Sequence, residues 1–253
     1  MTDASTTSRP LFNRQQLISL FLPLVAEQAL SISIGLADTL MVSSVGEAAV
    51  SGVSLVDSFN VLMIQLLSAL ATGGAVVVSQ YLGAKEQEHA NASSGQLILL
   101  SALLGVGVGV FCFVLARPMI RLCYGSIDAD VLEAGVLYLR ITAVSYPFLA
   151  MYNAGAALFR SMGNSKISMQ ISILMNIINI VGNAVCIFVL GMGVDGAAIA
   201  TVIGQIFACV FALVLNLKKN PELHLVFRGF RPNWRIIGSI YAIGLPSVVM
   251  MAI

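Results

Sequence analysis

One carboxylate of the sequence stands inside a long apolar run, where an ionised side chain is costly. Asp38 lies in SIGLADTLMVSSVG (residues 33–46), and neither this stretch nor the preceding LISLFLPLVAEQALSI contains a lysine or arginine. Insertion scales put an aspartate at the centre of a membrane helix at about 3 kcal/mol, so such a residue is expected to have a partner or a function. The chemistry that a lone carboxylate offers there is exchange of a proton or a small cation.

Three further ionisable residues fall within apolar runs, and each has a structural explanation beside a functional one. Glu27 precedes Asp38 by eleven positions, so at 100° per residue the two share one helix face, about 16 Å apart along the axis. Glu27 is interpreted as snorkelling or as capping a bend near Pro23. For Asp57 and Arg140 the sequence supports a structural ion pair and a functional role equally.

The composition decides the class of protein. Hydrophobic residues make up 58% of the 253 residues and charged residues 10%, with a mean hydropathy of +0.93. Soluble domains carry about a quarter charged residues, so this chain has too few to cover a water-exposed surface. The apolar runs are long enough for helices that cross about 30 Å of hydrocarbon, and they lack the alternation of barrel strands. The predicted fold class is an all-α integral membrane protein.

The runs predict six complete spans and the start of a seventh helix. The spans are expected at 17–44, 50–82, 92–116, 131–158, 167–190 and 196–217. The predicted parts are a cytoplasmic tail at 1–16, a six-helix lobe at 17–217, a cytoplasmic inter-lobe linker at 218–235 and a truncated seventh helix at 236–253. Leu-Pro recurs early in the first and seventh spans, as a repeat of six spans per half produces. On this interpretation the chain is a fragment.

Basic residues predict which side of the membrane each loop faces. With a cytoplasmic N-terminus, the outer segments hold Arg117 and Arg121. The inner segments hold Arg9, Arg14, Lys85, Arg160, Lys166, Lys218, Lys219, Arg228, Arg231 and Arg235. This asymmetry is a positive-inside bias, so a multi-pass protein of the cell membrane with its N-terminus in the cytoplasm is expected.

Polar side chains from several spans are expected in one layer near the outer side. Asp38, Asp57 and Asn183 each lie about two turns from the outer end of their predicted spans, Tyr138 and Arg140 lie at similar depth, and Thr201 lies about a turn into its span. Asn179 and Asn183, four positions apart, also share a helix face. Taken singly, Asn176, Gln65 and Gln205 are interpreted as interhelical hydrogen-bonding residues worth about 0.6 kcal/mol each. The predicted layer consists of Asp38, Asp57, Tyr138, Arg140, Asn179, Asn183 and Thr201.

Other chemistries have no recognisable motif in the sequence. It contains no GxxxxGK[ST], HExxH or GxSxG and no cluster of cysteine and histidine ligands, so neither an enzyme site nor a cofactor is predicted. The four cysteines are scattered along the chain, mostly in or beside apolar runs, where a cysteine behaves as a small hydrophobic residue. A net charge of +1 gives no reason to expect nucleic acid. GVGVGV at 105–110 lies inside a span and indicates close helix packing.

Five stretches form a set whose order and spacing are informative. They are PLVAEQALSISIGLADTLMVSSVGEAAVSGVSL, SQYLGAKEQEHA, YLRITAVSYPF, ALFRSMGNSK and LGMGVDGAAIAT. From about Leu11 onward the chain resembles the N-terminal half of the bacterial multidrug and toxic compound extrusion transporters, the MATE family. The resemblance implies twelve helices in two lobes with a central cavity, and antiport of organic cations against H⁺ or Na⁺.

The resemblance also implies roles for particular positions. Asp38, Asn179 and Thr201 match the polar cation-binding pocket of the first lobe. Tyr138 and Asn153 match neighbouring positions in span four. Pro23 matches the proline at which the first helix bends.

The chain departs from the family pattern at one of these positions. Asn183 stands where well-known members carry an aspartate, which leaves Asp38 the main anion unless Asp57 or Glu27 contributes. An Asp–Asn–Asn–Thr set of oxygens, from Asp38, Asn179, Asn183 and Thr201, is able to hold Na⁺. A desolvated carboxylate equally suits proton exchange, and the sequence leaves the coupling ion open.

The sequence therefore predicts a secondary active antiporter that exports organic cations in exchange for H⁺ or Na⁺. Asn153, Asp57, Glu27 and Gln65 are secondary candidates that line the substrate cavity. The expected partners are small organic cations, the lipid bilayer and the missing C-terminal lobe. Two alternatives stay open: a lipid-linked oligosaccharide flippase, and a non-transporting sensor or assembly subunit, with a homodimer of half-length chains as a further arrangement.

Overall fold

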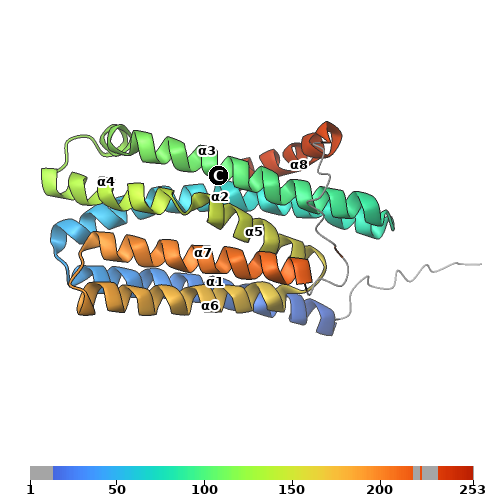
Figure 1. Cartoon of the computed structure of the whole chain (residues 1–253), viewed down its shortest axis with the longest axis horizontal. Coiled ribbons are helices and arrows are strands. Elements are labelled where there is room, and N and C mark those ends of the chain that lie inside the picture. Colours follow the sequence, from blue (N-terminus) through green and yellow to red (C-terminus); the bar gives the residue numbers. More distant parts are fainter. Residues whose placement is uncertain (1–13, 219–222, 224–232, 253) are drawn as a thin grey trace, which may run out of the picture.

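The computed structural model describes residues 14–218, 223 and 233–252, and its regular elements are helices (Figure 1). The predicted all-α fold class is confirmed. The elements are α1 (Arg14–Ser43), α2 (Glu47–Gly83), α3 (Gln87–Tyr124), α4 (Ala129–Ala143), α5 (Tyr146–Ser161), α6 (Ser165–Ala184), η1 (Val185–Val189), α7 (Val194–Lys218) and α8 (Trp234–Ala252).

The helices follow the predicted spans closely. In the described part of the chain, five helices are long and apolar enough to cross a membrane, and α4 with α5 makes a sixth span when the pair is taken together. The π-helical turn η1 continues α6, so the two together cover the span predicted at 167–190. Much of the predicted tail and linker, at 1–13, 219–222 and 224–232, lies outside the described residues, as does 253. The division into tail, lobe, linker and seventh helix stays a prediction.

The fourth predicted span, 131–158, is covered by two helices that together make one span, rather than by a single continuous helix. The span breaks between Ala143 and Tyr146, where α4 and α5 meet at an angle of 51°. Pro147 in the first turn of α5 explains the break, because proline has no N–H for the carbonyl one turn earlier and its ring clashes with that carbonyl. The two linking residues close α4 with tight hydrogen bonds of 3.2 and 2.9 Å.

Two glycines of α3 lie against this break at very short range. A Cβ on Gly105 would lie 2.7 Å from Pro147 Cα, and one on Gly109 would lie 2.7 Å from the carbonyl oxygen of Ala143. Gly107 between them has nothing within 4 Å of such an atom. The predicted close packing of the GVGVGV stretch is therefore confirmed, through two of its three glycines.

The helices divide into two groups. Helices α1, α6 and α7 lie side by side along one edge of the bundle, and α2 packs on α3, α4, α5 and α8 (Figure 1). Helix α1 packs mainly on α6 and touches α2 only lightly. Much of the α1 surface is consequently exposed, including Phe21, Leu36 and Leu40. The space between α1 and α2 is where the polar residues of the two groups meet.

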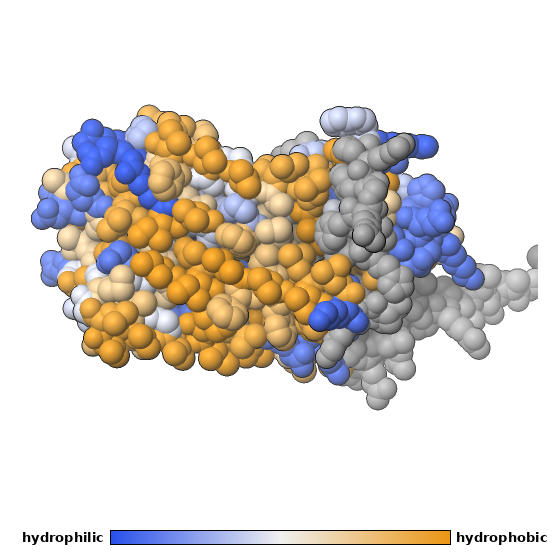
Figure 2. Space-filling view, viewed as in Figure 1, coloured by the Kyte–Doolittle hydropathy of each residue, from blue (hydrophilic) through white to orange (hydrophobic). Residues whose placement is uncertain are grey.

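The surface has the pattern of a membrane protein. A broad band of apolar residues runs across the face in Figure 2, with polar residues gathered towards both ends. We call one end the first-loop end; it holds the turns at 44–46, 125–128 and 190–193. The other is the second-loop end, which holds the turns at 84–86 and 162–164. An apolar belt between two polar ends fits a protein that crosses the bilayer with its helices.

The basic residues predicted for the inner side lie at the second-loop end where they are described. These residues are Arg14, Lys85, Arg160, Lys166, Lys218 and Arg235. The remaining four, Arg9, Lys219, Arg228 and Arg231, lie outside the described residues. Which end faces the cytoplasm stays a prediction.

Candidate cation-binding site

Asp38 lies on α1 where this helix packs against α6, and two asparagines of α6 face it. Asn183 donates from Nδ2 to Asp38 Oδ1 at 2.5 Å. Both asparagines are buried, with 7% of Asn179 and 1% of Asn183 exposed. They stand one turn apart on the same helix face, as predicted, and so they approach the carboxylate from two heights.

The Asn179 amide links the carboxylate of α1 to a hydroxyl of α7. With its nitrogen facing α1, Asn179 donates to both oxygens of Asp38, at 2.9 and 3.2 Å, and its oxygen accepts from the Thr201 hydroxyl at 3.0 Å. The reversed amide donates to the Thr201 oxygen at 3.0 Å. We adopt the first orientation because it gives every polar atom of the amide a complementary partner. Three helices are then joined by one hydrogen-bonded chain.

Asp38 and Thr201 line a cavity between the two helix groups, whereas Asn179 and Asn183 are not among its lining residues. The cavity has a volume of about 280 Å³. Tyr138 on α4 is buried, lines the same cavity and makes a side-chain hydrogen bond with Thr201. The lining consists of Gly35, Asp38, Asp57, Asn60, Val61, Ile64, Tyr138, Thr142, Ser145, Tyr146, Leu149, Thr201 and Gln205. Four residues of the predicted polar layer therefore line one cavity: Asp38, Asp57, Tyr138 and Thr201.

Asp57 on α2 lines the same cavity as Asp38. Asn60, one turn further along α2, donates to Asp57 Oδ1 over 3.5 Å. The Asn60 oxygen accepts from the hydroxyl of Tyr146 at 2.7 Å. Tyr146 is only 2% exposed and is held at the break between α4 and α5. The break therefore positions a hydroxyl that orients the partner of a carboxylate.

Several other predicted residues lie outside the cavity lining. Gln65 and Asn153 do not line the cavity; Asn153 is 9% exposed and its Nδ2 has no hydrogen-bond partner within the described residues. Asn176 likewise has an unpaired Nδ2 in the described part of the chain. For these three residues the geometry gives no support to a cavity role. Gln205, in contrast, lines the cavity.

Arg140 does not pair with Asp57. Its guanidinium lies over the ring of Phe113 on α3, 5.8 Å from the centroid, and the side chain is exposed on the outside of the bundle. Among the described residues, the ion pairs are Glu86–His89, Arg117–Glu133 and Glu27–Arg160. Arg140 therefore lies on the outside of the helix bundle. Asp57 has no basic partner in the described part of the chain.

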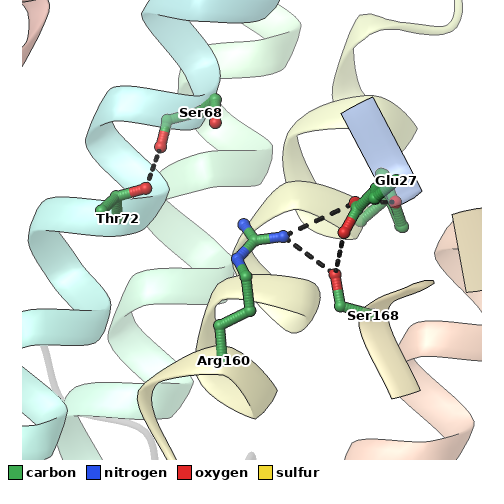
Figure 3. A network of polar contacts seen from close by, with 6 residues as sticks. Glu27, Ser68, Thr72, Arg160 and Ser168 are labelled. Carbon is green, nitrogen blue, oxygen red and sulfur yellow. Dashed lines mark hydrogen bonds and ion pairs between the residues drawn. The ribbon is translucent and has the colours of Figure 1, made fainter. Parts of the chain in front are cut away.

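Glu27 has a partner that the sequence did not reveal. It lies on α1 towards the second-loop end, where its Oε1 is 3.8 Å from Nη1 of Arg160 at the end of α5 (Figure 3). Ser168 on α6 bridges the two, donating to Glu27 at 3.1 Å and accepting from Arg160 at 2.9 Å. Tyr152 also donates to Glu27, over 3.5 Å. Glu27 therefore ties α1 to α5 and α6, away from the cavity, and does not simply snorkel.

Pro23 is a buried residue inside α1, which continues without interruption to Ser43. Proline removes one helical hydrogen bond and weakens the helix at that point. It stands one turn from Glu27, so the ion pair holds α1 just beyond its weakest point. The hinge role of Pro23 stays a prediction.

The residues that sequence reasoning missed are mainly partners of the carboxylates. Asn60 follows Asp57 by three positions, and this i, i+3 spacing on one helix was a usable signal. Tyr146 gave none, because its orientation depends on the broken span. Thr142, at the end of α4, and Ser145, in the link between α4 and α5, also line the cavity next to this break.

The site has the chemistry of a monovalent cation site. Asp38 supplies a negative charge, and Asn183 Oδ1 is a buried acceptor without a hydrogen-bond partner among the described residues. With the Thr201 hydroxyl these oxygens suit a hard cation, and the carboxylate alone suits a proton. No cluster of three or more histidine, cysteine, aspartate or glutamate side chains occurs in the described part of the chain.

Comparison with known proteins agrees with this architecture. The MatE family profile matches residues 23–185, which is more than half of the chain. The chain belongs to the MatE family. This stretch runs from Pro23 in α1 to the end of α6, and it therefore includes Asp38, Asp57 and both asparagines.

Several curated proteins resemble this MatE chain over nearly its whole length. The uncharacterized transporter YisQ of Bacillus subtilis is 28% identical over 249 residues, covering 96% of this chain and 54% of that protein. The multidrug export protein MepA of Staphylococcus aureus is 24% identical over 245 residues, covering 95% of this chain and 53% of that protein. The chain spans about half the length of the curated relatives it matches.

Solved structures show the same fold. A MATE transporter in its bent conformation aligns with a TM-score of 0.88 at 24% identity, covering 94% of this chain and 53% of that one. A transporter of the MOP superfamily from Pyrococcus furiosus aligns with a TM-score of 0.86, covering 93% and 52%. The predicted match to one half of a two-lobe MATE transporter is thereby confirmed for the fold.

Proposed function

We propose that this chain is the first lobe of a multidrug efflux transporter that exports organic cations in exchange for H⁺ or Na⁺. The observation that carries the proposal is the cavity that holds Asp38 and Asp57, with no lysine or arginine among its lining residues. Such a cavity attracts cations and disfavours anions. The export of multiple drugs by curated relatives, MepA among them, supports the substrate class.

Asp38 is the exchange site in this proposal. When H⁺ or Na⁺ occupies the carboxylate, its charge is neutralised, and the amide donors of Asn179 and Asn183 lose part of their attraction to it. Because α1 packs mainly on α6, weakening these bonds loosens the main contact of α1 with the lobe. The ion thus favours one arrangement of α1 and the substrate favours the other, as coupling requires.

The orientation and location belong to the same proposal. The second-loop end faces the cytoplasm and the first-loop end faces outwards, with the protein in the cell membrane. The cavity residues Asp38 and Thr201 stand nearer the first-loop end. In this orientation they meet ions from outside, where the inward gradient of H⁺ or Na⁺ begins.

The lipid-linked oligosaccharide flippase receives less support. Such a substrate carries phosphates, which need basic residues in the cavity, and Arg140 faces the outer surface instead. A non-transporting sensor or assembly subunit differs from a transporter in moving no substrate, which transport measurements distinguish.

The test is efflux of a cationic dye from vesicles carrying the natural full-length protein, under imposed H⁺ or Na⁺ gradients. The proposal expects one inward gradient to drive efflux, and Asp38→Asn to abolish that driven component. A wild-type protein that moves no cationic dye under either gradient would contradict it, and uptake of lipid-linked phosphates would favour the flippase.

A further inference from the structure

The cavity contains two carboxylates, and their surroundings are built alike. On one side, the Thr201 hydroxyl donates to the oxygen of Asn179, whose nitrogen donates to Asp38. On the other side, the Tyr146 hydroxyl donates to the oxygen of Asn60, whose nitrogen faces Asp57. In each case a hydroxyl fixes an amide, and the amide presents N–H to a carboxylate. Hydrogen bonds from N–H groups favour the negatively charged form of a carboxylate, so both carboxylates are able to bind a cation.

The two carboxylates differ in how fully they are satisfied. Asp38 accepts three amide contacts of 2.5–3.2 Å. Within the residues that the structure describes, Asp57 accepts a single hydrogen bond, and at 3.5 Å it is a long one. No basic residue pairs with Asp57 in the described part of the chain. Asp57 therefore has more open acceptor positions towards the cavity than Asp38, whose two oxygens already accept three amide contacts.

The walls around Asp57 are also more apolar. Val61 and Ile64 follow it along α2 at one-turn intervals, and Leu149 and the ring of Tyr146 face them from α5. Asp38 is instead bonded to the amides of Asn179 and Asn183, and Asn179 links it to the Thr201 hydroxyl. A positive group with an apolar body fits the first setting, and a small ion fits the second.

We propose that Asp57 binds the positively charged nitrogen of the transported substrate, at a site separate from the ion-exchange site at Asp38. The apolar body of the substrate lies along Val61, Ile64 and Leu149. At about 280 Å³ the cavity is near the lower limit for drug-sized ligands, so it holds the cationic end of a substrate. This inference rests on the proposed function and names the residue that selects the substrate's charge.

Two nearby negative sites give a direct form of competition. Asp38 and Asp57 interact electrostatically, and Tyr138 lies within the field of both. A cation at either carboxylate therefore lowers the attraction of the other for a second cation. Binding of an ion at Asp38 therefore lowers the affinity of Asp57 for the cationic substrate, although the two ligands do not touch.

The experiment measures binding to the purified full-length protein of ethidium, a permanently charged dye, and of Nile red, an uncharged one. Asp57→Asn keeps the shape of the side chain and removes its charge. Asp57→Glu restores the charge, and Asp130→Asn makes the same change at an exposed position of α4. We expect Asp57→Asn to weaken ethidium binding about tenfold or more and to leave Nile red binding unchanged. Asp57→Glu recovers most of the loss, and Asp130→Asn has no effect.

Three results would overturn the inference. They are unchanged ethidium binding in Asp57→Asn, an equal loss of both dyes in that variant, and no ethidium binding by the wild-type protein. Gradient-driven efflux in vesicles, measured on the same preparations, separates this inference from the proposed function. A wild type that binds ethidium through Asp57 but moves none contradicts transport only. Driven efflux that survives Asp57→Asn with unchanged affinity contradicts this inference only.

Discussion

Glu27 on α1 and Arg160 at the end of α5 form an ion pair across 3.8 Å, with Ser168 of α6 hydrogen-bonded to both. The pair lies towards the second-loop end, whereas Asp38 joins α1 to α6 nearer the first-loop end. Helix α1 is therefore attached to its neighbours at two points along its length. Pro23 lies one turn from the attachment at Glu27. Any movement of α1 that follows ion binding at Asp38 has to occur between these points or break one of them.

Removing either partner of the Glu27–Arg160 pair is expected to destabilise the lobe. The side chains are 19% and 25% exposed, so Glu27→Gln or Arg160→Met leaves a partly buried charge without its counter-charge. We expect a loss of about 1–2 kcal/mol for each, and less than the sum for the double variant. Thermal unfolding in detergent measures these losses. The exposed Arg117–Glu133 pair is the matched control and should contribute less than about 1 kcal/mol. Equal losses for the two pairs would contradict this account of α1.

A methyl group at Gly105 is expected to disturb the break between α4 and α5. Its Cβ would lie 2.7 Å from Pro147 Cα and 2.8 Å from the carbonyl oxygen of Tyr146. Gly105→Ala should cost about 1–3 kcal/mol and also weaken cation binding, since Tyr146 orients the partner of Asp57. Gly107→Ala, which meets nothing within 4 Å, is the control and should be neutral. Melting temperature and ethidium affinity are the two readouts. If Gly105→Ala is as neutral as Gly107→Ala, the close packing has no energetic importance.

Asn183→Asp adds a second carboxylate next to Asp38. The present donor contact of 2.5 Å would be replaced by repulsion between like charges unless a cation bridges them. The variant should therefore bind H⁺ or Na⁺ more tightly, with the half-saturating ion concentration lowered about tenfold. Dye efflux measured over a range of ion concentrations gives this value. Asn183→Leu serves for comparison and should weaken coupling, because Asp38 then loses a donor. An ion dependence that is the same in Asn183→Asp as in wild type would show that residue 183 does not face the ion.

The fold was predictable from the sequence because each membrane span is a local pattern of apolar residues. The spans and their order were obtained in this way, and so was the packing of Gly105 and Gly109. The break at Val144–Ser145 was missed, although Pro147 signals it, because the apolar run continues through it and proline is tolerated in membrane helices. A composition average does not detect a local change of direction.

The candidate site was predictable only where residues repeat along one helix or match a known family. Asn179 and Asn183 share a face by spacing alone, and Asp38 stood out as an isolated charge. The Glu27–Arg160 pair joins positions more than one hundred residues apart, and the Tyr146–Asn60 bond does nearly the same, so both depend on how the helices are arranged. Arg140 is exposed and lies over Phe113, and the sequence alone did not indicate which side of the helix it occupies.

The most direct test of the account is whether the substrate displaces an ion from Asp38. Purified full-length protein is titrated with ethidium in two separate experiments. In weakly buffered solution the released H⁺ is measured, and after loading with radioactive Na⁺ the released Na⁺ is measured. Wild type is expected to release about one ion per substrate bound. Asp38→Asn is expected to bind ethidium and to release none. Release from Asp38→Asn equal to that from wild type would contradict the central claim, because the exchanged ion would then come from another site.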